Sequence, residues 1–172
     1  MARSEWAPPE QMEHVLAALT PENRLVAEVC MRTGLRVGDV LRLKTNQLQG
    51  QRFTVQEQKT GKNRRIYLPK KLYETLLSQA GYIWVFPGRC DGKKHRTRQA
   101  VYKDIKRAAK AFRLPQNVTP HSMRKAWAVG EFARVGGDLQ RVQHMLNHSD
   151  PSITLLYVMA DELTQRKKTA NM

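Results

Sequence analysis

Tyr157 and His148 stand nine positions apart in a run that also holds Asp150 and Pro151, near the carboxyl end of a very basic chain. A deprotonated phenol is a nucleophile that can attack phosphorus, and an imidazole can donate a hydrogen bond to a phosphate oxygen. This chemistry also needs cations that hold the phosphate and an acid that protonates the leaving oxygen. A tyrosine in the sequence Leu-Leu-Tyr-Val is otherwise an ordinary core residue, so the other groups decide the interpretation.

Arg36 is the first candidate for holding a phosphate. It follows the sequence Thr33-Gly34-Leu35, in which Gly34 ends a predicted helix. Its planar guanidinium can present two N–H groups to two nonbridging phosphate oxygens. Asp39, three residues later, is expected on the same side of the next helix, where its carboxylate would orient Arg36. An Arg and an Asp at this spacing are more often a surface pair of little energetic value, so other segments must support the hypothesis.

A second guanidinium comes from the segment that begins at Thr119 and Pro120. Proline fits the first turn of a helix, and positions three apart share a helix face. His121 and Arg124 are therefore expected to point toward one place. A single histidine at a helix start is more often a cap or a solvated side chain than a catalytic group, so this pair also depends on the other segments.

The proton donor is sought in a predicted β-hairpin, because Thr60-Gly61 is typical of a turn. Lys59 and Lys62 both lie on this turn. An ammonium group whose pKa is lowered by burial or by nearby positive charge can protonate a departing 5′ oxygen. Lys59 is the preferred candidate for this acid, and Lys62 is the alternative. The simpler interpretation of a basic hairpin tip is contact with backbone phosphates.

The composition favours a polyanionic partner. The 172 residues include 30 Lys and Arg against 15 Asp and Glu, a net charge of +15, and residues 89–113 hold ten of the cations against two Asp. Double-stranded DNA is the predicted partner, because an anionic membrane would call for a basic amphipathic anchor that the sequence lacks. For the basic run alone, a solvated helix face is an equal alternative. The predicted DNA-contacting cations are Lys62, Arg64, Lys93, Lys94, Arg96, Arg98 and Lys125.

The spacing of apolar residues predicts an α+β fold that is mainly α-helical and has a small antiparallel β-sheet. Helices are expected over residues 8–19, 21–33, 37–43, 70–80, 97–112, 122–135, 139–146 and 152–159. Strands are expected over residues 52–58, 64–68 and 83–86, and a loop over residues 87–96. A hydrophobic content of 41% suits one globular domain with an ordinary core.

The cysteines and the chain start indicate the cellular setting. Cys30 and Cys90 form no disulfide framework and are predicted to be free thiols in a reducing compartment. The sequence shows no signal peptide and no apolar run near the roughly 18 residues that suggest a membrane span. The protein is therefore expected in the cytoplasm. No carboxylate cluster has metal-ligand spacing, so no metal is expected.

Taken in order, these segments resemble the tyrosine recombinases of the phage integrase family. In that family an Arg follows Thr-Gly-Leu, a Lys lies on a β-hairpin, His-x-x-Arg opens a later helix, and Leu-Gly-His precedes the Tyr. The resemblance spans about residues 7–160. Any one of these motifs can occur by chance in an unrelated protein, but the complete set in this order rarely does. The resemblance implies phosphate clamps at Arg36 and Arg124, a leaving-group acid at Lys59, an acid/base partner at His121, a phosphate hydrogen-bond donor at His148, a nucleophile at Tyr157 and a supporting carboxylate at Asp39.

The resemblance implies site-specific recombination by transesterification, without a metal or a nucleotide cofactor. Tyr157 would attack a DNA phosphate, the 5′-hydroxyl would leave, and a 3′-phosphotyrosyl bond would allow rejoining. Asn147 departs from the family pattern, where Gly is usual, and so does Lys125, where His is common. A type IB topoisomerase-like relaxing activity and a non-catalytic DNA-binding module are the alternatives. The Thr-Gly-Leu-Arg and hairpin context counts against the topoisomerase, and the complete residue set counts against the binding module.

The resemblance also implies a domain organisation. Residues 1–160 are expected to form the catalytic domain, and residues 161–172 a polar C-terminal tail that is disordered in the isolated chain. Family members commonly carry an upstream helical core-binding domain, which is not expected in this chain. A homotetramer on synapsed DNA and a monomer in its absence are the expected states, and in the family such a tail often docks on a neighbouring protomer.

Overall fold

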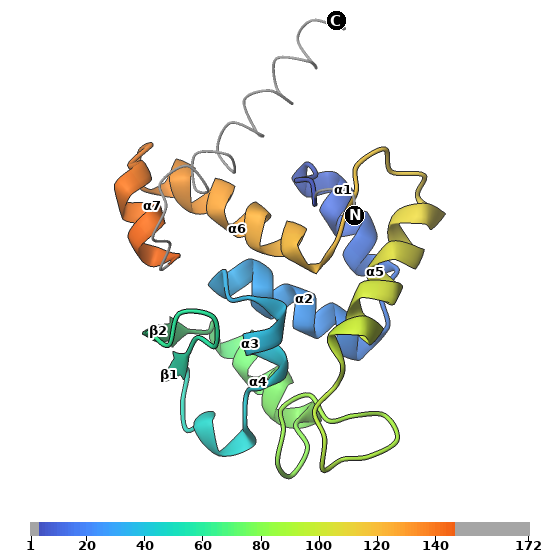
Figure 1. Cartoon of the computed structure of the whole chain (residues 1–172), viewed down its shortest axis with the longest axis vertical. Coiled ribbons are helices and arrows are strands. Elements are labelled where there is room, and N and C mark those ends of the chain that lie inside the picture. Colours follow the sequence, from blue (N-terminus) through green and yellow to red (C-terminus); the bar gives the residue numbers. More distant parts are fainter. Residues whose placement is uncertain (1–3, 147–172) are drawn as a thin grey trace, which may run out of the picture.

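The computed structural model describes residues 4–146. In this part of the chain, the helices pack against one another, and a two-stranded antiparallel sheet lies at one side of them (Figure 1). The elements are α1 (Pro9–Ala17), α2 (Pro21–Thr33), α3 (Val37–Leu41), the 3-10 helix η1 (Thr45–Gln47), β1 (Arg52–Gln56), β2 (Asn63–Tyr67), α4 (Lys70–Gln79), α5 (Arg98–Ala111), α6 (Pro120–Arg134) and α7 (Leu139–Met145). The predicted mainly helical α+β fold is confirmed. The helix predicted over residues 152–159 lies outside the described residues.

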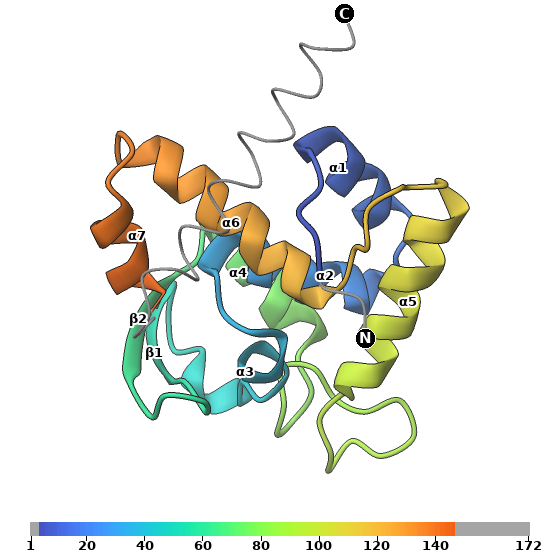
Figure 2. The ribbon, with the colours of Figure 1, turned by 45° about the horizontal axis from the view of Figure 1, so that its top comes forward.

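Helix α2 is the central element. Proline suits its first position, Pro21, because the N–H at that position has no partner within a helix. The helix packs against α1, α3, α5 and α6, which lie around it in both views (Figures 1 and 2). A helix that is covered on several faces must be apolar on several faces. Its buried apolar residues are Leu25, Val26, Ala27, Val29 and Cys30.

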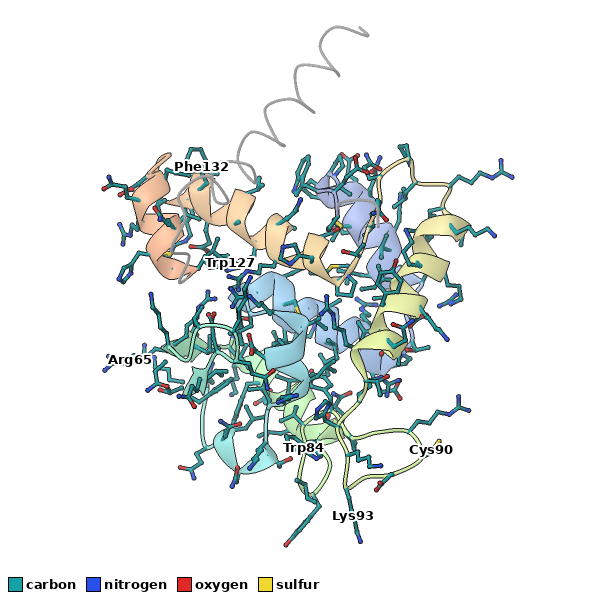
Figure 3. All side chains as sticks on the ribbon, in the orientation of Figure 1. Arg65, Trp84, Cys90, Lys93, Trp127 and Phe132 are labelled. Carbon is teal, nitrogen blue, oxygen red and sulfur yellow. The ribbon has the colours of Figure 1, made fainter. Side chains whose placement is uncertain are left out.

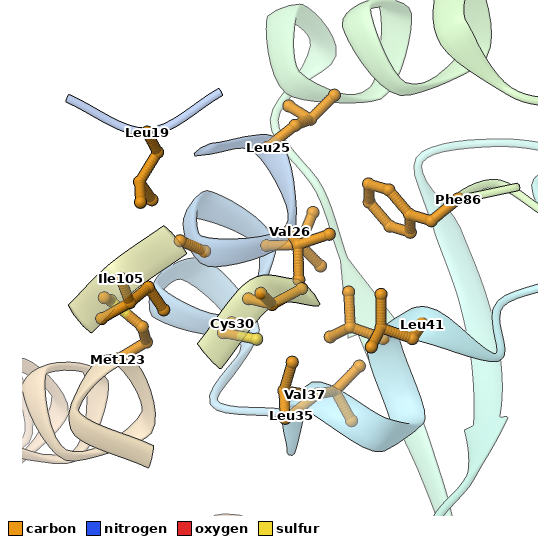
Figure 4. Packing of buried hydrophobic residues seen from close by; sticks show 14 of the residues in the cluster. Leu19, Leu25, Val26, Cys30, Leu35, Val37, Leu41, Phe86, Ile105 and Met123 are labelled. Atoms are coloured by element: carbon orange, nitrogen blue, oxygen red, sulfur yellow. The ribbon is translucent and has the colours of Figure 1, made fainter. Parts of the chain in front are cut away.

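The main hydrophobic core forms where α2 meets its neighbours (Figure 4). Each fully buried Val, Leu, Ile, Phe or Met side chain contributes roughly 1.5–3 kcal/mol to folding. The core therefore fixes α2, α3, α5 and α6 relative to one another, and these helices carry most of the candidate site. Its members include Val26, Cys30, Leu41, Phe86, Ile105 and Met123.

A buried carboxylate joins α5 to the start of α2. Asp104 Oδ2 accepts hydrogen bonds from the Thr20 backbone N–H at 2.9 Å, the Thr20 hydroxyl at 3.0 Å and Asn23 Nδ2 at 2.8 Å. Burial would raise the pKa of Asp104, but hydrogen bonds from Asn23, Thr20 and Arg107 outweigh it and hold that pKa below its usual value. A negative charge is also favoured at a helix N-terminus, so this contact fixes the start of α2.

The β-hairpin has its predicted turn. Phe53 lies opposite Ile66, and Val55 lies opposite Arg64. Val55 and Ile66 are buried, because alternate residues of each strand face the helices. Gly61 has a φ of 67° in the connecting turn, a conformation that glycine adopts without strain. The turn residues 57–62 therefore project from the sheet as one compact tip.

The strand predicted over residues 83–86 was wrong. A single isolated bridge joins Trp84 to Lys44, and the Val85 N–H donates to the Leu43 carbonyl at 2.9 Å. Pairing ends there because the partner segment turns into η1 at Thr45. The loop predicted over residues 87–96 is present, and it carries Cys90 and Lys93 away from the helices (Figure 3).

A smaller apolar cluster attaches α7 to α6. Its buried members are Ala128, Val142 and Leu146, and Trp127 and Phe132 pack against them (Figure 3). The cluster is separate from the main core. It therefore sets the position of Leu146, the last described residue, relative to α6.

Both cysteines are free thiols, as predicted; Cys30 is buried and Cys90 is exposed. Burial raises the pKa of the Cys30 thiol to about 12, so this thiol stays protonated in the core. Within residues 4–146, no helix is long and apolar enough to cross a membrane.

Candidate active site

Arg36 lies at the corner between α2 and α3. Gly34 ends α2 with a φ of 67°, and a Cβ at this position would clash with the Trp127 ring of α6. Leu35 is fully buried, and Arg36 has an extended backbone just before α3. Glycine at this corner thus allows α6 to pack closely, while the Arg36 side chain keeps 22% of its surface exposed.

Glu57 is the partner of Arg36. Arg36 Nη1 donates to Glu57 Oε2 at 2.5 Å, and Glu57 is fully buried one residue beyond the end of β1. Its other oxygen, Oε1, lies 3.5 Å from Arg64 Nη1. Glu57 was absent from the sequence-predicted site. The only signal was an acid in a stretch of cations, a pattern that is common on protein surfaces.

Asp39 does not pair with Arg36, contrary to expectation. Its Oδ1 accepts the backbone N–H of Gln58 at 3.0 Å. Arg36 precedes the first helical residue and is extended, so the spacing of three does not bring the two side chains onto one helix face. Burial raises the pKa of Asp39, the Gln58 N–H opposes this rise, and Glu57 adds to it. Asp39 therefore anchors the hairpin, one residue before Lys59.

Lys59 and Lys62 both lie on the hairpin turn and are exposed. The Glu57 N–H donates to the Lys62 carbonyl at 2.9 Å, and the Gly61 N–H donates to the Glu57 carbonyl at 2.8 Å. These bonds fix the backbone of the turn, while both lysine side chains extend into solvent. The choice of Lys59 over Lys62 as the acid stays a prediction.

Arg124 approaches the same corner from α6. Its side chain is buried, with 1% exposed; Nη1 donates to the Gly34 carbonyl at 2.5 Å, and Nη2 donates to the Leu146 carbonyl at 2.8 Å. Thr119 caps the start of α6 by accepting the His121 N–H at 3.2 Å. Arg124 therefore joins α6 to the end of α7 and to the residue that stands two positions before Arg36.

His121 stands at the start of α6 among cations. Burial, followed by the charges of Arg124, Lys125, Arg36 and Arg98, lowers the pKa of His121 to about 4. More than a third of the residue is nevertheless exposed, so water offsets part of the effect of burial on this pKa. The nearby cations lower the pKa in addition to burial. The imidazole is consequently neutral near pH 7 and can accept a proton.

The predicted groups of the described part converge. The charges of Arg36 and Arg124 act on His121, and they also oppose the raised pKa of Asp39, so the two guanidinium groups lie within electrostatic reach of both His121 and Asp39. The Lys59 hairpin is anchored beside them. Within residues 4–146, no group of three or more His, Cys, Asp or Glu side chains could hold a metal ion. The arrangement therefore offers guanidinium, imidazole and ammonium groups to an anion.

Residues 5–163 match the phage integrase family. The chain belongs to this family. It is 34% identical over 141 residues to the tyrosine recombinase XerD of Rhizobium meliloti, which covers 76% of this chain and 44% of that protein. It is 28% identical over 149 residues to the integrase of Escherichia phage P2, with 86% of this chain and 41% of that protein covered. The chain spans about half the length of the curated relatives that it matches.

Solved structures of the phage integrase family share the fold. A lambda integrase (residues 75–356) dimer bound to a COC′ core site has a TM-score of 0.77 at 20% identity, covering 92% of this chain and 60% of that one. The XerA recombinase has a TM-score of 0.72 at 19% identity, covering 95% of this chain and 63% of that one. At these sequence identities, the structural similarity establishes the fold of this chain.

Four of the cations that were predicted to contact DNA are exposed on the surface of the protein. They are Lys62, Lys93, Lys94 and Arg98. Lys94 Nζ lies 4.0 Å from an Asp91 oxygen in the loop, and such exposed pairs cost little to break. Their contact with DNA stays a prediction.

Arg64 is held inside the protein. Its Nη2 donates to the Thr33 carbonyl at 2.5 Å, and its guanidinium lies 5.0 Å from the centre of the Trp127 ring. Burial lowers the pKa of Arg64, and the charge of Glu57 opposes this effect. The guanidinium therefore joins β2 to α2 and α6, where it was expected to face DNA.

Arg96 and Lys125 also have internal partners. Arg96 Nε donates to Asn23 Oδ1 at 2.6 Å, which joins the loop to α2. Lys125 is buried, and its Nζ donates to the Ser4 carbonyl at 2.6 Å. Charge pattern alone could not separate these cations from exposed ones, because their acceptors come from distant parts of the sequence.

Two residues with predicted catalytic roles lie outside the described residues. They are His148 and Tyr157. Asn147, which departs from the family pattern, also lies there. The roles predicted for these residues stay predictions.

Proposed function

We propose that this chain performs site-specific DNA recombination, in which a strand is cut and rejoined through a covalent 3′-phosphotyrosyl bond to Tyr157. One observation carries the proposal: Arg124 binds the Gly34 carbonyl two positions before Arg36, beside His121 and the anchored Lys59 hairpin. Preorganised cations and hydrogen-bond donors of this kind stabilise the charge that develops on a phosphate under attack. Membership of the phage integrase family supports the same chemistry.

The residues divide the work of one transesterification. The Tyr157 oxygen forms a bond to phosphorus, the bond from phosphorus to the 5′ oxygen breaks, and Lys59 gives that oxygen a proton. Arg36, Arg124 and His148 hold the nonbridging oxygens. His121 is neutral near pH 7 because its pKa is low, so it acts first as an acceptor for the phenol proton.

Arg124 adds a condition to this mechanism. Only 1% of its surface is exposed, and two backbone carbonyls occupy donors of its guanidinium. A phosphate reaches Arg124 only when the residues that cover it move. Assembly of the full site is therefore coupled to DNA binding, as is common in enzymes that complete their sites around the substrate.

Double-stranded DNA is the proposed partner. The net charge of +15 and the exposed cations Lys62, Lys93, Lys94 and Arg98 favour contact with backbone phosphates. Lambda integrase has been solved as a tetramer on a Holliday junction, and we propose a tetramer on synapsed DNA and a monomer in its absence.

Residues 1–160 form the catalytic domain and residues 161–172 a tail, and the protein acts in the cytoplasm.

A covalent trap tests the proposal. The chain is incubated with duplex DNA that carries its cognate site and a nick beside the cut position, so that the cleaved end diffuses away. A protein–DNA adduct is expected for the wild type and for Tyr82→Phe, which changes a fully exposed loop tyrosine. Tyr157→Phe should form none. Absence of an adduct in the wild type would support a binding module, and relaxation of supercoils without strand exchange would support a topoisomerase.

A further inference from the structure

Glu57 is a buried carboxylate that none of the predicted roles uses. Its side chain is fully buried, and its two oxygens face the guanidinium groups of Arg36 at 2.5 Å and Arg64 at 3.5 Å. Burying an unpaired carboxylate is unfavourable, and removing one partner of a buried pair is strongly destabilising. The position therefore requires both the carboxylate and its arginines.

We propose that Glu57 is a positioning residue that holds the Arg36 guanidinium in the orientation in which it binds the scissile phosphate. The inference rests on the proposed function. Arginine has a long side chain with many rotamers, so a fixed carboxylate lowers the ordering that the transition state must otherwise impose. Glu57 is the only ion-pair partner of Arg36 within the described part of the chain.

Arg64 is the second guanidinium that holds the Glu57 carboxylate. Arg64 contacts its second oxygen, donates to the Thr33 carbonyl at 2.5 Å and stacks on the Trp127 ring. Trp127 in turn packs over the Gly34 corner. A continuous set of contacts thus runs from α6 through Arg64 and Glu57 to Arg36.

Glu57 and the residue after it attach the hairpin to the start of α3. The Glu57 side chain pairs with Arg36, and the next residue, Gln58, gives its N–H to Asp39. Arg36 and Asp39 lie three residues apart around the start of α3. Two adjacent hairpin residues therefore bind one short stretch of chain, and Lys59 follows directly.

The charge of Glu57 argues for positioning over substrate contact. A carboxylate repels phosphate, and this one is fully buried, so it acts on DNA through Arg36 and not by direct contact. Its loss should leave DNA binding almost unchanged or slightly tighter, because one negative charge near the phosphate disappears. The cleavage rate should fall, because a misdirected catalytic group loses transition-state contact.

Single-turnover cleavage of nicked duplex by the full chain tests this. We expect Glu57→Gln to cut about 10- to 100-fold more slowly, while its Kd for DNA changes less than about threefold. Glu28→Gln removes the carboxylate from an exposed pair with Arg24 on α2 and should behave as the wild type. A Glu57→Gln rate equal to or above the wild-type rate would overturn the inference.

A substrate with sulfur in place of the 5′ bridging oxygen identifies the group through which Glu57 acts. Thiolate leaves without a proton, so sulfur should restore the rate of Lys59→Ala. Arg36 serves nonbridging oxygens, so the Glu57→Gln defect should persist. Restoration of the Glu57→Gln rate by sulfur would show that Glu57 serves the lysine instead, and the inference would be wrong.

Two further measurements keep the inference open to refutation. If Glu57→Gln does not fold, Glu57→Asp is measured; it keeps the charge but shortens the side chain, and we expect an intermediate rate, whereas a wild-type rate would contradict the inference. If the wild type forms no adduct, the proposed function fails. Nitrogen-15 relaxation of Arg36 Nε then decides separately, because Glu57→Gln should increase its motion, and unchanged motion would refute the role of Glu57.

Discussion

Arg124 Nη1 donates a hydrogen bond to the carbonyl oxygen of Gly34 at 2.5 Å. The bond links residues 90 positions apart, and it joins the His121 helix to the corner that presents Arg36. Arg124 therefore supports the position of Arg36 as well as carrying a charge of its own. Stability and activity are consequently coupled at this corner.

Arg124→Ala should destabilise the protein by about 3 kcal/mol, because the buried carbonyls of Gly34 and Leu146 lose a donor. Urea unfolding followed by circular dichroism measures the change. Arg24→Ala, which removes an exposed helix-surface pair with Glu28, should hardly shift the midpoint. A similar small shift for Arg124→Ala would contradict the structural role of this guanidinium.

Gly34→Ala should cost about 2–3 kcal/mol. The backbone has a φ of 67°, and the added Cβ would clash with the Trp127 ring. Gly130→Ala is the matched control, because it lies within α6 with nothing near the added Cβ, and it should stabilise the helix by up to about 1 kcal/mol. Thermal unfolding of both variants tests the contrast. Equal stability of the two variants would show that the corner is not tight.

His121 should make stability depend on pH between about 4 and 6.5. Its folded pKa of about 4 lies below the ordinary value of 6.5, so in this range the unfolded chain binds a proton that the folded chain does not. The contribution of His121 is complete above pH 6.5 and is lost as the pH falls toward 4. His121→Gln should flatten the profile, and the His121 ring protons should titrate near pH 4 by NMR. Titration near 6.5 would exclude the predicted shift.

Arg64→Lys should lower the stability by about 1–2 kcal/mol. Lysine keeps the charge but cannot both stack its planar group on Trp127 and reach the Thr33 carbonyl. The salt dependence of DNA binding should stay unchanged, because the side chain is internal. A flatter salt dependence with full stability would instead place Arg64 on the DNA, as its position in the sequence first indicated.

Lys93→Ala should leave the stability unchanged and weaken the salt dependence of DNA binding, which is the reverse of the result expected for Arg64→Lys. Lys93 is exposed on the loop over residues 87–96, so its removal should leave the unfolding midpoint in place. If it contacts a phosphate, the slope of log K against log salt should fall by about one. Fluorescence anisotropy over a salt series measures this slope. An unchanged slope would remove Lys93 from the DNA interface.

Local sequence patterns predicted the parts of this fold that depend on neighbouring residues. Helix α2 appears over its predicted residues, because Pro21 and Gly34 are strong start and stop signals and the apolar spacing between them is helical. The hairpin turn at Gly61 has the same origin. The strand over residues 83–86 failed because a strand also needs a partner, and the partner segment turns away at Thr45.

The sequence by itself determined which chemical groups are present and their order, and hence the family. Only the tertiary structure decided their partners: Arg36 binds Glu57 instead of Asp39, and Arg64 lies inside although it reads as a surface cation. Ion pairs depend on distance and burial, and residues distant in the sequence set both when the core packs. That is why a pattern of charges identified the chemistry, while the fold selected which charges remain available for it.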